Sequence, residues 1–273
     1  MEEAHILRRG YGPSRLVFTH LLQSHPILRE LRRREGLDGL VGSAKTELEM
    51  ILALRRWASR QWKCGNPDPY PPWNPLVILD WIRSGKTGGH CGQYAMVFLQ
   101  ACLSFAIQAR YVEIGQRANP CSHFTTEAWL SEFGKWAVMD ATASGKFGGY
   151  YLRKGLPQSA LELHGALVSE DTNSLDFVRD VEVPGGKGGP QTGLDNYYYL
   201  RVFFRQDQAV NPPRFVDPND TADRYEDSVE WEDEHTVPWE SSPFSGPIPK
   251  RRLTRRRTRD VRDLYWRPLP QRA

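Results

Sequence analysis

The chain has 273 residues, of which 40% are hydrophobic and 25% charged, and its formal net charge is 36 − 33 = +3. A chain of this length can bury a core without disulfides or metals to hold it. The aromatic content of 11% argues against disorder. The small net charge does not indicate a nucleic-acid-binding or membrane-binding protein. Four cysteines are too few for a disulfide scaffold of this size.

The sequence contains no run that approaches the roughly 18 apolar residues of a membrane span. The N-terminus, Met1–His5, carries two acidic residues and is followed by Leu7-Arg8-Arg9. It lacks the apolar segment of a secretory signal peptide. We therefore expect a protein without membrane contact, located in the cytoplasm, with its cysteines reduced.

Helical patterns fill the first part of the chain. Apolar residues recur there at roughly helical spacing, with Ser43 as a candidate cap and the segment from Cys91 as the strongest case. A proline-rich loop and a glycine-rich turn interrupt the pattern. The helices are predicted at residues 14–36, 43–63, 76–82 and 91–106.

Strand-like runs follow the helices, with a tight turn at Glu132-Phe133-Gly134 between two of them. An order of helices first and an antiparallel sheet second is typical of the α+β class. We therefore predict an α+β fold in which a helical N-terminal part packs on an antiparallel sheet. The strands are expected at Ala109–Ile114, Phe124–Leu130, Lys135–Met139 and Tyr197–Phe204.

The domain organisation is predicted as a helical N-terminal segment (1–42), a core (43–165) and an extended or partly disordered C-terminal extension (166–273). The extension contains an acidic stretch, 217–234, and a basic run, 250–262. The basic run either is solvated, lies against the acidic stretch, or docks a nucleic acid or acidic partner. We favour the first two, because charge runs are usually solvated, and do not expect nucleic-acid binding.

Cys91 is the residue whose surroundings point to chemistry. It follows a glycine turn and begins a predicted helix, where the helix dipole and unpaired N–H groups favour a thiolate. His123 and Asp140 lie on neighbouring predicted strands. If those strands pair, the imidazole can act as the base for the thiol and the carboxylate can orient it. By contrast, Cys102 lies on an apolar helix face and is expected in the core.

The segment Gly88–Ala95 resembles the nucleophile motif of the transglutaminase-like superfamily. Ala109–Val112 is similar to the first strand after its nucleophile helix, and His123–Trp129 and Lys135–Thr142 are similar to its His and Asp strands. The resemblance covers roughly residues 45–165. Three motifs in the correct order form a far more specific signal than one Gly-Xaa-Cys.

Two features depart from the common family pattern. Many members have tryptophan two residues after the histidine, where this chain has Thr125, and Trp129 comes later. An alternative alignment places Glu127 at the histidine position and implies an inactive protein; we prefer His123. The second departure is His90, which stands where the family more often has a bulkier or acidic residue.

The resemblance implies a papain-like fold and acyl transfer through a thioester on Cys91. Water as the acceptor gives a protease or amidase, whereas an amine gives a transglutaminase or ligase. Hydrolysis is the default expectation, with a peptide, a protein or a small amide as substrate. The alternative is an inactive papain-like module that binds peptide or another protein. The sequence decides neither the substrate nor the oligomeric state.

Several further residues are expected around the nucleophile. Gln61 or Trp62 is a candidate to stabilise an oxyanion, although each also fits a purely structural role. A metal site is not expected, because the cysteines and histidines near the motifs lack the usual spacing of paired ligands, and no cofactor is implied. The residues expected near the site are His90, Gly92, Trp129 and Trp136.

Overall fold

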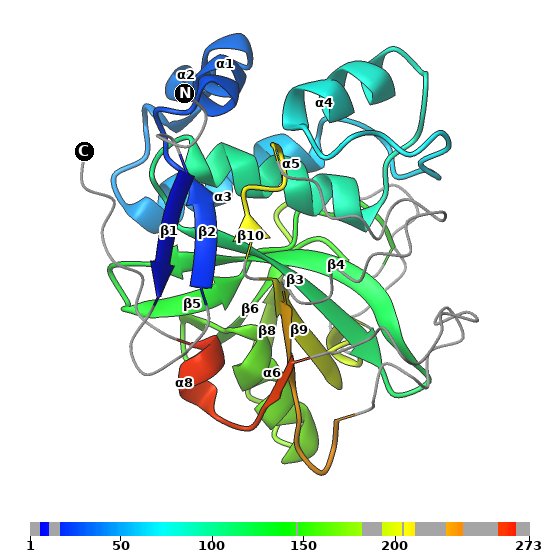
Figure 1. The fold of residues 1–273 in the computed structure, drawn as a ribbon. Coiled ribbons are helices and arrows are strands. Elements are labelled where there is room, and N and C mark those ends of the chain that lie inside the picture. Colours follow the sequence, from blue (N-terminus) through cyan, green and yellow to red (C-terminus); the bar gives the residue numbers. More distant parts are fainter. Residues whose placement is uncertain are drawn as a thin grey trace.

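The computed structural model contains seven short-to-medium helices and three sheets among its described residues (Figure 1). It describes residues 6–10, 17–145, 147–181, 193–203, 205–210, 228–236 and 256–265, without the side chains of 6–10, 17, 18, 121, 122 and 256. The helices are α1 (Pro26–Arg34), α2 (Leu37–Val41), α3 (Glu47–Ser59), α4 (Pro75–Arg83), α5 (Cys91–Leu103), α6 (Ala160–Val168) and α8 (Val261–Leu264). The α+β class predicted from the sequence is confirmed.

The strands follow mainly after α5, as predicted. They are β1 (Ile6–Gly10), β2 (Val17–Leu21), β3 (Ala109–Gln116), β4 (Asn119–Leu130), β5 (Lys135–Val138), β6 (Tyr150–Arg153), β7 (Leu156–Pro157), β8 (Leu175–Val178), β9 (Tyr199–Phe203), β10 (Arg205–Gln206), β11 (Ser228–Trp231) and β12 (Arg256–Thr258). The predicted turn between β4 and β5 is present, and Gly134 supplies its left-handed residue with a φ of +62°.

Side-chain caps decide where the helices that frame the site begin. The hydroxyl of Thr46 accepts the N–H of Glu49, so α3 begins at Glu47 and the cap predicted at Ser43 is wrong. Asn74 caps α4, and Pro75 occupies the first helical position, where its missing N–H costs nothing. The helices predicted at 43–63, 76–82 and 91–106 are confirmed; the first and third are shorter than predicted, and α4 is one residue longer at each end.

The prediction of a helix over residues 14–36 is wrong in its first half. Residues Val17–Leu21 form strand β2, which pairs antiparallel with β1 and parallel with β10. Among the described residues of this segment, 17–36, only those of α1, from Pro26 onward, are helical, and α1 buries Leu28 and Leu31; residues 14–16 lie outside the described part of the chain. Pairing with the neighbouring strand β1 and with the distant strand β10 therefore overrides the loose leucine spacing of this segment.

The central sheet has the strand order β12-β11-β9-β3-β4-β5. The pairs β3–β4, β4–β5, β3–β9 and β9–β11 are antiparallel, and β11–β12 is parallel. Strand β9 thus lies between β3 and β11, far from both in the sequence. The described part of the C-terminal region therefore completes the main sheet instead of forming an extended appendage.

The acidic and basic runs meet in this sheet, as one of the sequence hypotheses proposed. Strand β11 comes from the acidic stretch and β12 from the basic run. Arg257 lies 3.3 Å from Glu230, and Arg259 lies 3.5 Å from Glu232. Residues 217–227 and 250–255 lie outside the described residues. The described parts of the two runs therefore pair with each other.

Two hydrophobic cores cover the two faces of the central sheet. The larger core contains α5, which is buried along nearly its whole length, together with residues of α1, α3 and α4. The smaller core lies on the other side and includes α6 and β9 residues. Figure 1 shows α5 crossing the sheet, with α1, α2 and α4 beyond it. This packing fixes the first turn of α5 against the strands that follow it.

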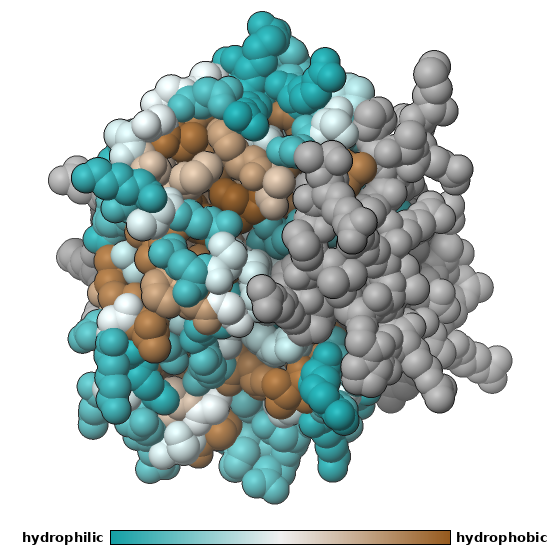
Figure 2. Space-filling view, turned by 90° about the vertical axis from the view of Figure 1, so that its left-hand side faces the viewer, coloured by the Kyte–Doolittle hydropathy of each residue, from teal (hydrophilic) through white to brown (hydrophobic). Residues whose placement is uncertain are grey.

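The surface is mixed in character. Figure 2 shows the face at the left of Figure 1, where separate brown apolar areas are interspersed with teal hydrophilic side chains. Within the described ranges, no helix is both long and apolar enough to span a lipid bilayer.

Candidate active site

Cys91 is the first residue of α5, directly after a tightly packed glycine turn. Its backbone N–H therefore belongs to the first turn of the helix, where N–H groups have no partner within the helix. A Cβ at Gly89 would lie 2.7 Å from Trp62 Nε1, and one at Gly88 would lie 2.3 Å from Asn66 O. Only glycine allows this close approach, which holds the turn and the thiol in place.

His90 caps the same helix. Its Nδ1 accepts the N–H of Gly92 at 3.2 Å, and Gln93 Oε1 accepts the N–H of His90 at 3.0 Å, which makes a reciprocal capping box. The Nδ1 atom also lies 4.0 Å from Cys91 Sγ. The sequence-predicted residues His90 and Gly92 therefore do lie beside the nucleophile candidate, and their observed contacts organise the helix start.

His123 and Asp140 are brought together by the antiparallel strands β4 and β5. His123 lies on β4 opposite Ile114 of β3, and Asp140 follows β5 by two residues. The distance from His123 Nε2 to Asp140 Oδ2 is 2.8 Å, and Asp140 Oδ1 accepts the N–H of Thr142 at 2.8 Å. Because Asp140 engages Nε2, Nδ1 is the ring nitrogen left for the thiol.

Arg55 supports this arrangement from below. Its side chain on α3 is completely buried, and Nη1 donates to the carbonyl oxygen of Asp140 at 2.9 Å. Ser59 Oγ donates to the carbonyl of Ala141, also at 2.9 Å. Two consecutive peptide units are thus fixed to α3, so the carboxylate has little freedom to turn away from His123.

The electrostatics of the three groups favour an ion pair. Burial alone would raise the pKa of the Cys91 thiol, but the hydrogen bond and charge of His123, with a smaller effect of His90, lower it to about 6. Burial would lower the pKa of His123, but the charge and hydrogen bond of Asp140, with help from Cys91, raise it to about 9. Between these values the site holds a thiolate beside an imidazolium.

Asp140 stays ionised although it is buried. Burial would raise the pKa of its carboxyl, but the charge and hydrogen bond of His123 and the bonds from Thr142 lower it below its ordinary value. All three groups therefore carry their charged forms near neutral pH: a thiolate able to attack, an imidazolium able to donate a proton and a carboxylate able to orient it.

Two tyrosines that were not predicted lie beneath the first turn of α5. A Cβ at Gly92 would lie 3.0 Å from Tyr111 Oη and 3.5 Å from Tyr70 Oη. Burial is the largest cause that raises the pKa of each hydroxyl above its usual range, and the nearby Cys91 raises it further, so both remain protonated. Glycine at position 92 makes room for them, which is a physical reason for the Cys-Gly pair.

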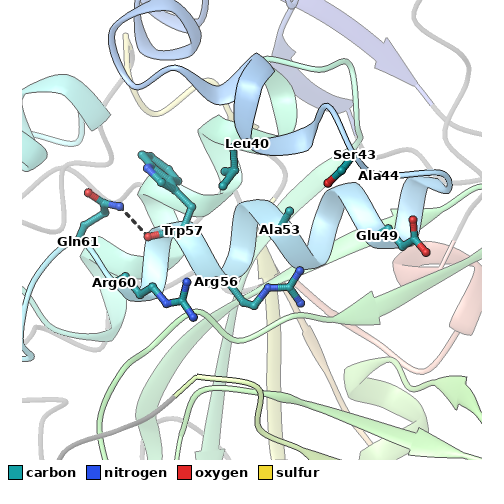
Figure 3. Close-up of a pocket in the computed structure, with 9 residues that line it drawn as sticks. All are labelled: Leu40, Ser43, Ala44, Glu49, Ala53, Arg56, Trp57, Arg60 and Gln61. Carbon is teal, nitrogen blue, oxygen red and sulfur yellow. Dashed lines mark hydrogen bonds between the residues drawn. The ribbon is translucent and has the colours of Figure 1, made fainter.

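The two candidate oxyanion donors have other acceptors in this structure. Gln61 Nε2 donates to the carbonyl of Trp57 at 2.7 Å, and Gln61 Oε1 accepts from Arg83. Figure 3 shows Gln61 beside a cavity of about 380 Å³ along α3. Trp62 Nε1 donates to the carbonyl of Gly89 at 3.2 Å, and its ring stacks on Tyr94. These contacts support a structural role for both residues.

Trp129 and Trp136, predicted near the site, lie at the other end of the strands. They pair across β4 and β5 with ring centroids 5.6 Å apart. Trp129 is six residues from His123 along β4, which corresponds to about 20 Å of extended strand. Both rings line a separate cavity with Leu161 and Tyr265. The two tryptophans shield the far ends of β4 and β5 from water. The prediction was wrong because closeness to His123 and Asp140 in the sequence does not mean closeness along an extended strand.

Glu127, the alternative candidate for the histidine position, is occupied elsewhere. It is completely buried, accepts a hydrogen bond from Arg110 Nε at 2.7 Å and binds the N–H of Ala160 at 2.8 Å. Its contacts are structural, and the residue placed with Cys91 and Asp140 is His123.

The other cysteines differ from Cys91 in their surroundings. Cys102 is completely buried in the core, as predicted, and burial raises the pKa of its thiol well above its ordinary value. Cys64 is exposed, and partial burial is the main cause that raises the pKa of its thiol. The side chain of Cys121 lies outside the described residues. Among the described thiols, Cys91 has the lowered pKa.

Residues 35–141 of the chain match the family model of the transglutaminase-like superfamily. The match contains the turn before Cys91, His123 and Asp140, so the resemblance seen in the motifs is confirmed over these residues. The match supports a cysteine-dependent function in general. No curated protein matches the sequence.

Solved structures show more distant similarity. One is the "Putative Cysteine Protease from Cytophaga hutchinsonii", with 21% identity and a TM-score of 0.32 over 43% of this chain and 41% of that chain. Another is the "putative protease from Parabacteroides distasonis", with 12% identity and a TM-score of 0.28 over 40% of this chain and 26% of that chain. The chain thus spans less than half the length of either.

Proposed function

We propose that this protein is a cysteine-dependent acyl-transfer enzyme in which Cys91 is the nucleophile, His123 the general base and acid, and Asp140 the residue that orients His123. The observation that carries the proposal is the buried 2.8 Å contact of His123 with Asp140, together with the half-buried Cys91 thiol, whose pKa the hydrogen bond and charge of His123 lower to about 6. An inactive binding module has no need of a thiolate held in this way.

The proposed reaction begins with attack of the Cys91 thiolate on the carbonyl carbon of an amide. The negative charge that develops on the carbonyl oxygen is stabilised by the backbone N–H of Cys91 at the start of α5. His123, already protonated, donates its proton to the leaving amine, and an acyl-thioester remains on Cys91. Asp140 keeps the imidazole aligned throughout.

Resolution of the thioester completes the cycle. His123 accepts a proton from a water molecule as that water attacks the thioester carbonyl, and the carboxylic acid leaves with the thiolate regenerated. Hydrolysis of a peptide or other amide is the preferred outcome, because water reaches any site that is not specially closed. An amine in place of water would give transglutaminase or ligase activity by the same steps.

Selective alkylation tests the proposal within a single protein. Iodoacetamide should modify Cys91 with a half-maximal rate near pH 6, whereas Cys64 and Cys102 should react only at higher pH or on unfolding. The rate at each cysteine is measured by peptide mass spectrometry over pH 5 to 10. Equal slow modification of all cysteines would contradict the proposal.

Turnover requires a second measurement. A library of peptide amides and free amines should compete with an electrophilic thiol probe at Cys91, and the accepted substrates should yield free acid in water. Cys91→Ala should abolish product formation while Cys102→Ala leaves it in place. The ratio of acid to amine conjugate, measured with increasing amine, separates hydrolysis from transfer.

A further inference from the structure

Phe147 covers the face of the His123 imidazole. The two ring centroids lie 3.6 Å apart, and the planes are 3° from parallel. This separation is close to the optimal contact distance between carbon atoms, so no water fits between the rings. His123 is 1% exposed as a result of such contacts.

The loop that carries Phe147 begins at Asp140 and ends at Gly149, and these two residues are joined by backbone hydrogen bonds. The N–H of Asp140 donates to the carbonyl of Gly149 at 2.9 Å, and the N–H of Gly149 donates back at 3.0 Å. Within the loop, the N–H of Phe147 donates to the carbonyl of Ser144 at 3.0 Å. The residue that bonds the edge of the imidazole and the residue that covers its face therefore belong to one closed loop.

Two glycines make this loop conformation possible. Gly148 has a φ of +85°, and a Cβ there would lie 2.2 Å from the carbonyl oxygen of Thr142. A Cβ at Gly149 would lie 2.4 Å from the carbonyl oxygen of Val178. Neither position accepts a side chain in this backbone conformation. The two glycines therefore allow the tight turn that places the Phe147 ring against His123.

We propose that Phe147 is a positioning residue that holds the His123 ring in the plane in which one nitrogen reaches Asp140 and the other reaches Cys91. The inference rests on the proposed function. A single hydrogen bond at Nε2 lets the ring tilt about the bond axis, whereas a parallel ring against its face removes that freedom. Phe147 thereby acts through His123 and needs no contact with substrate.

The stack also acts on charge. The face of a phenyl ring is electronegative and attracts a cation that lies over it, and His123 is that cation between about pH 6 and 9. The charged groups that face His123 are Cys91 from α5 and Asp140 after β5, with Arg55 of α3 behind Asp140. Removing the ring leaves these groups in place but withdraws one stabilising contact from the imidazolium.

The test compares Phe147→Ala, Phe147→Leu and Phe147→Tyr by the pH profile of Cys91 alkylation with iodoacetate. This anion is attracted by the neighbouring imidazolium, so its rate rises as the Cys91 thiol ionises and falls as His123 loses its proton. The native profile should have a plateau from about pH 6 to about 9. In Phe147→Ala, the plateau rate should fall about tenfold, and the upper limit should move down by about one pH unit, the size of a desolvated cation–π contact. Phe147→Leu keeps a side chain of similar size without the aromatic face, so its upper limit should also move down. Phe147→Tyr keeps the aromatic face and should have the native plateau rate and upper limit.

Phe105→Ala provides the matched control, because that ring also lies beneath a cation, Arg32, at 4.0 Å and outside the site. It should leave the profile unchanged. A Phe147→Ala or Phe147→Leu protein that is folded by circular dichroism and has the native upper limit and rate would overturn the inference. If Phe147→Ala does not fold, Phe147→Leu decides. Failure of the proposed function is a different result, since the native protein itself would then lack the plateau.

Discussion

Replacement of Asp140 by asparagine removes one charge from the site while keeping the shape of the side chain. Burial lowers the pKa of His123, but Asp140, with a smaller contribution from Cys91, more than compensates, and the pKa rises from 6.5 to about 9. The difference, 9 − 6.5 = 2.5, corresponds to roughly 3 kcal/mol in favour of the imidazolium, because one pKa unit is worth about 1.4 kcal/mol. In Asp140→Asn, only Cys91 still opposes the effect of burial, and the pKa of His123 should fall from about 9 toward its ordinary value of 6.5.

The loss of positive charge on His123 also changes the pKa of the Cys91 thiol. A neutral imidazole no longer lowers the pKa of Cys91, so that pKa should rise from about 6 toward its ordinary value of 9. At pH 7 the thiolate fraction, and with it the alkylation rate, should fall by roughly 30- to 100-fold. The assay is the second-order rate of iodoacetamide modification of Cys91 from pH 5 to 10, read by mass spectrometry.

The control is a second, partly buried His–Asp pair outside the site. His164 Nε2 lies 2.7 Å from Asp233 Oδ2, so Asp233→Asn makes the same chemical change elsewhere. It should leave the reactivity of Cys91 unchanged. The electrostatic reasoning is refuted if Asp140→Asn keeps the rise in rate near pH 6, or if the control lowers the rate equally.

Three further changes test other parts of the structure. Glu127→Ala leaves Arg110 buried without its 2.7 Å partner, so the free energy of unfolding in urea should fall by about 3 to 5 kcal/mol. The pH profile of Cys91 alkylation should stay the same; a changed profile would favour the alignment that places Glu127 at the histidine position. Gly89→Ala places a methyl group 2.7 Å from Trp62 Nε1 and should slow Cys91 alkylation by about tenfold or more. Its control is Gly165→Ala, where no atom lies within 4 Å and a gain of about 0.5 to 1 kcal/mol in stability is expected. Burial would raise the pKa of the Asp233 carboxyl, but hydrogen bonds from Trp231 and His164 lower it below its ordinary value of 3.8. The ionised carboxylate therefore stabilises the folded protein above pH 3.8, and this stabilisation is lost as the pH falls further. Asp233→Asn should therefore flatten acid unfolding between pH 2 and 4 by circular dichroism.

Local patterns predicted the part of the fold in which neighbours in sequence are neighbours in space. The helix from Cys91 and the strands β3, β4 and β5 were predicted because periodicity and turn residues determine them. Strand β2 was mistaken for a helix because its partners β1 and β10 are not visible in its own sequence. The same limit hid the place of β9 within the main sheet.

In the candidate site, too, the residues in local motifs were predicted and the residues brought in by tertiary packing were not. The motifs identify Cys91, His123 and Asp140, and the structure places them together. Arg55 and Tyr111 were missed, because buried side chains on an amphipathic helix and a strand look like ordinary core residues. Phe147 had a possible signal, since it is the single aromatic residue among the glycines at 145, 148 and 149.

The position of β9 has a consequence for the timing of synthesis. Every residue of the proposed triad has been synthesised once Asp140 is made, yet the free edge of β3 gains its partner only after residues Tyr199–Phe203 are made. At about 5 to 20 residues per second, that delay lasts several seconds. During this interval the nascent chain carries an unpaired edge beside a reactive thiol, so completion of the site is coupled to translation of the C-terminal half.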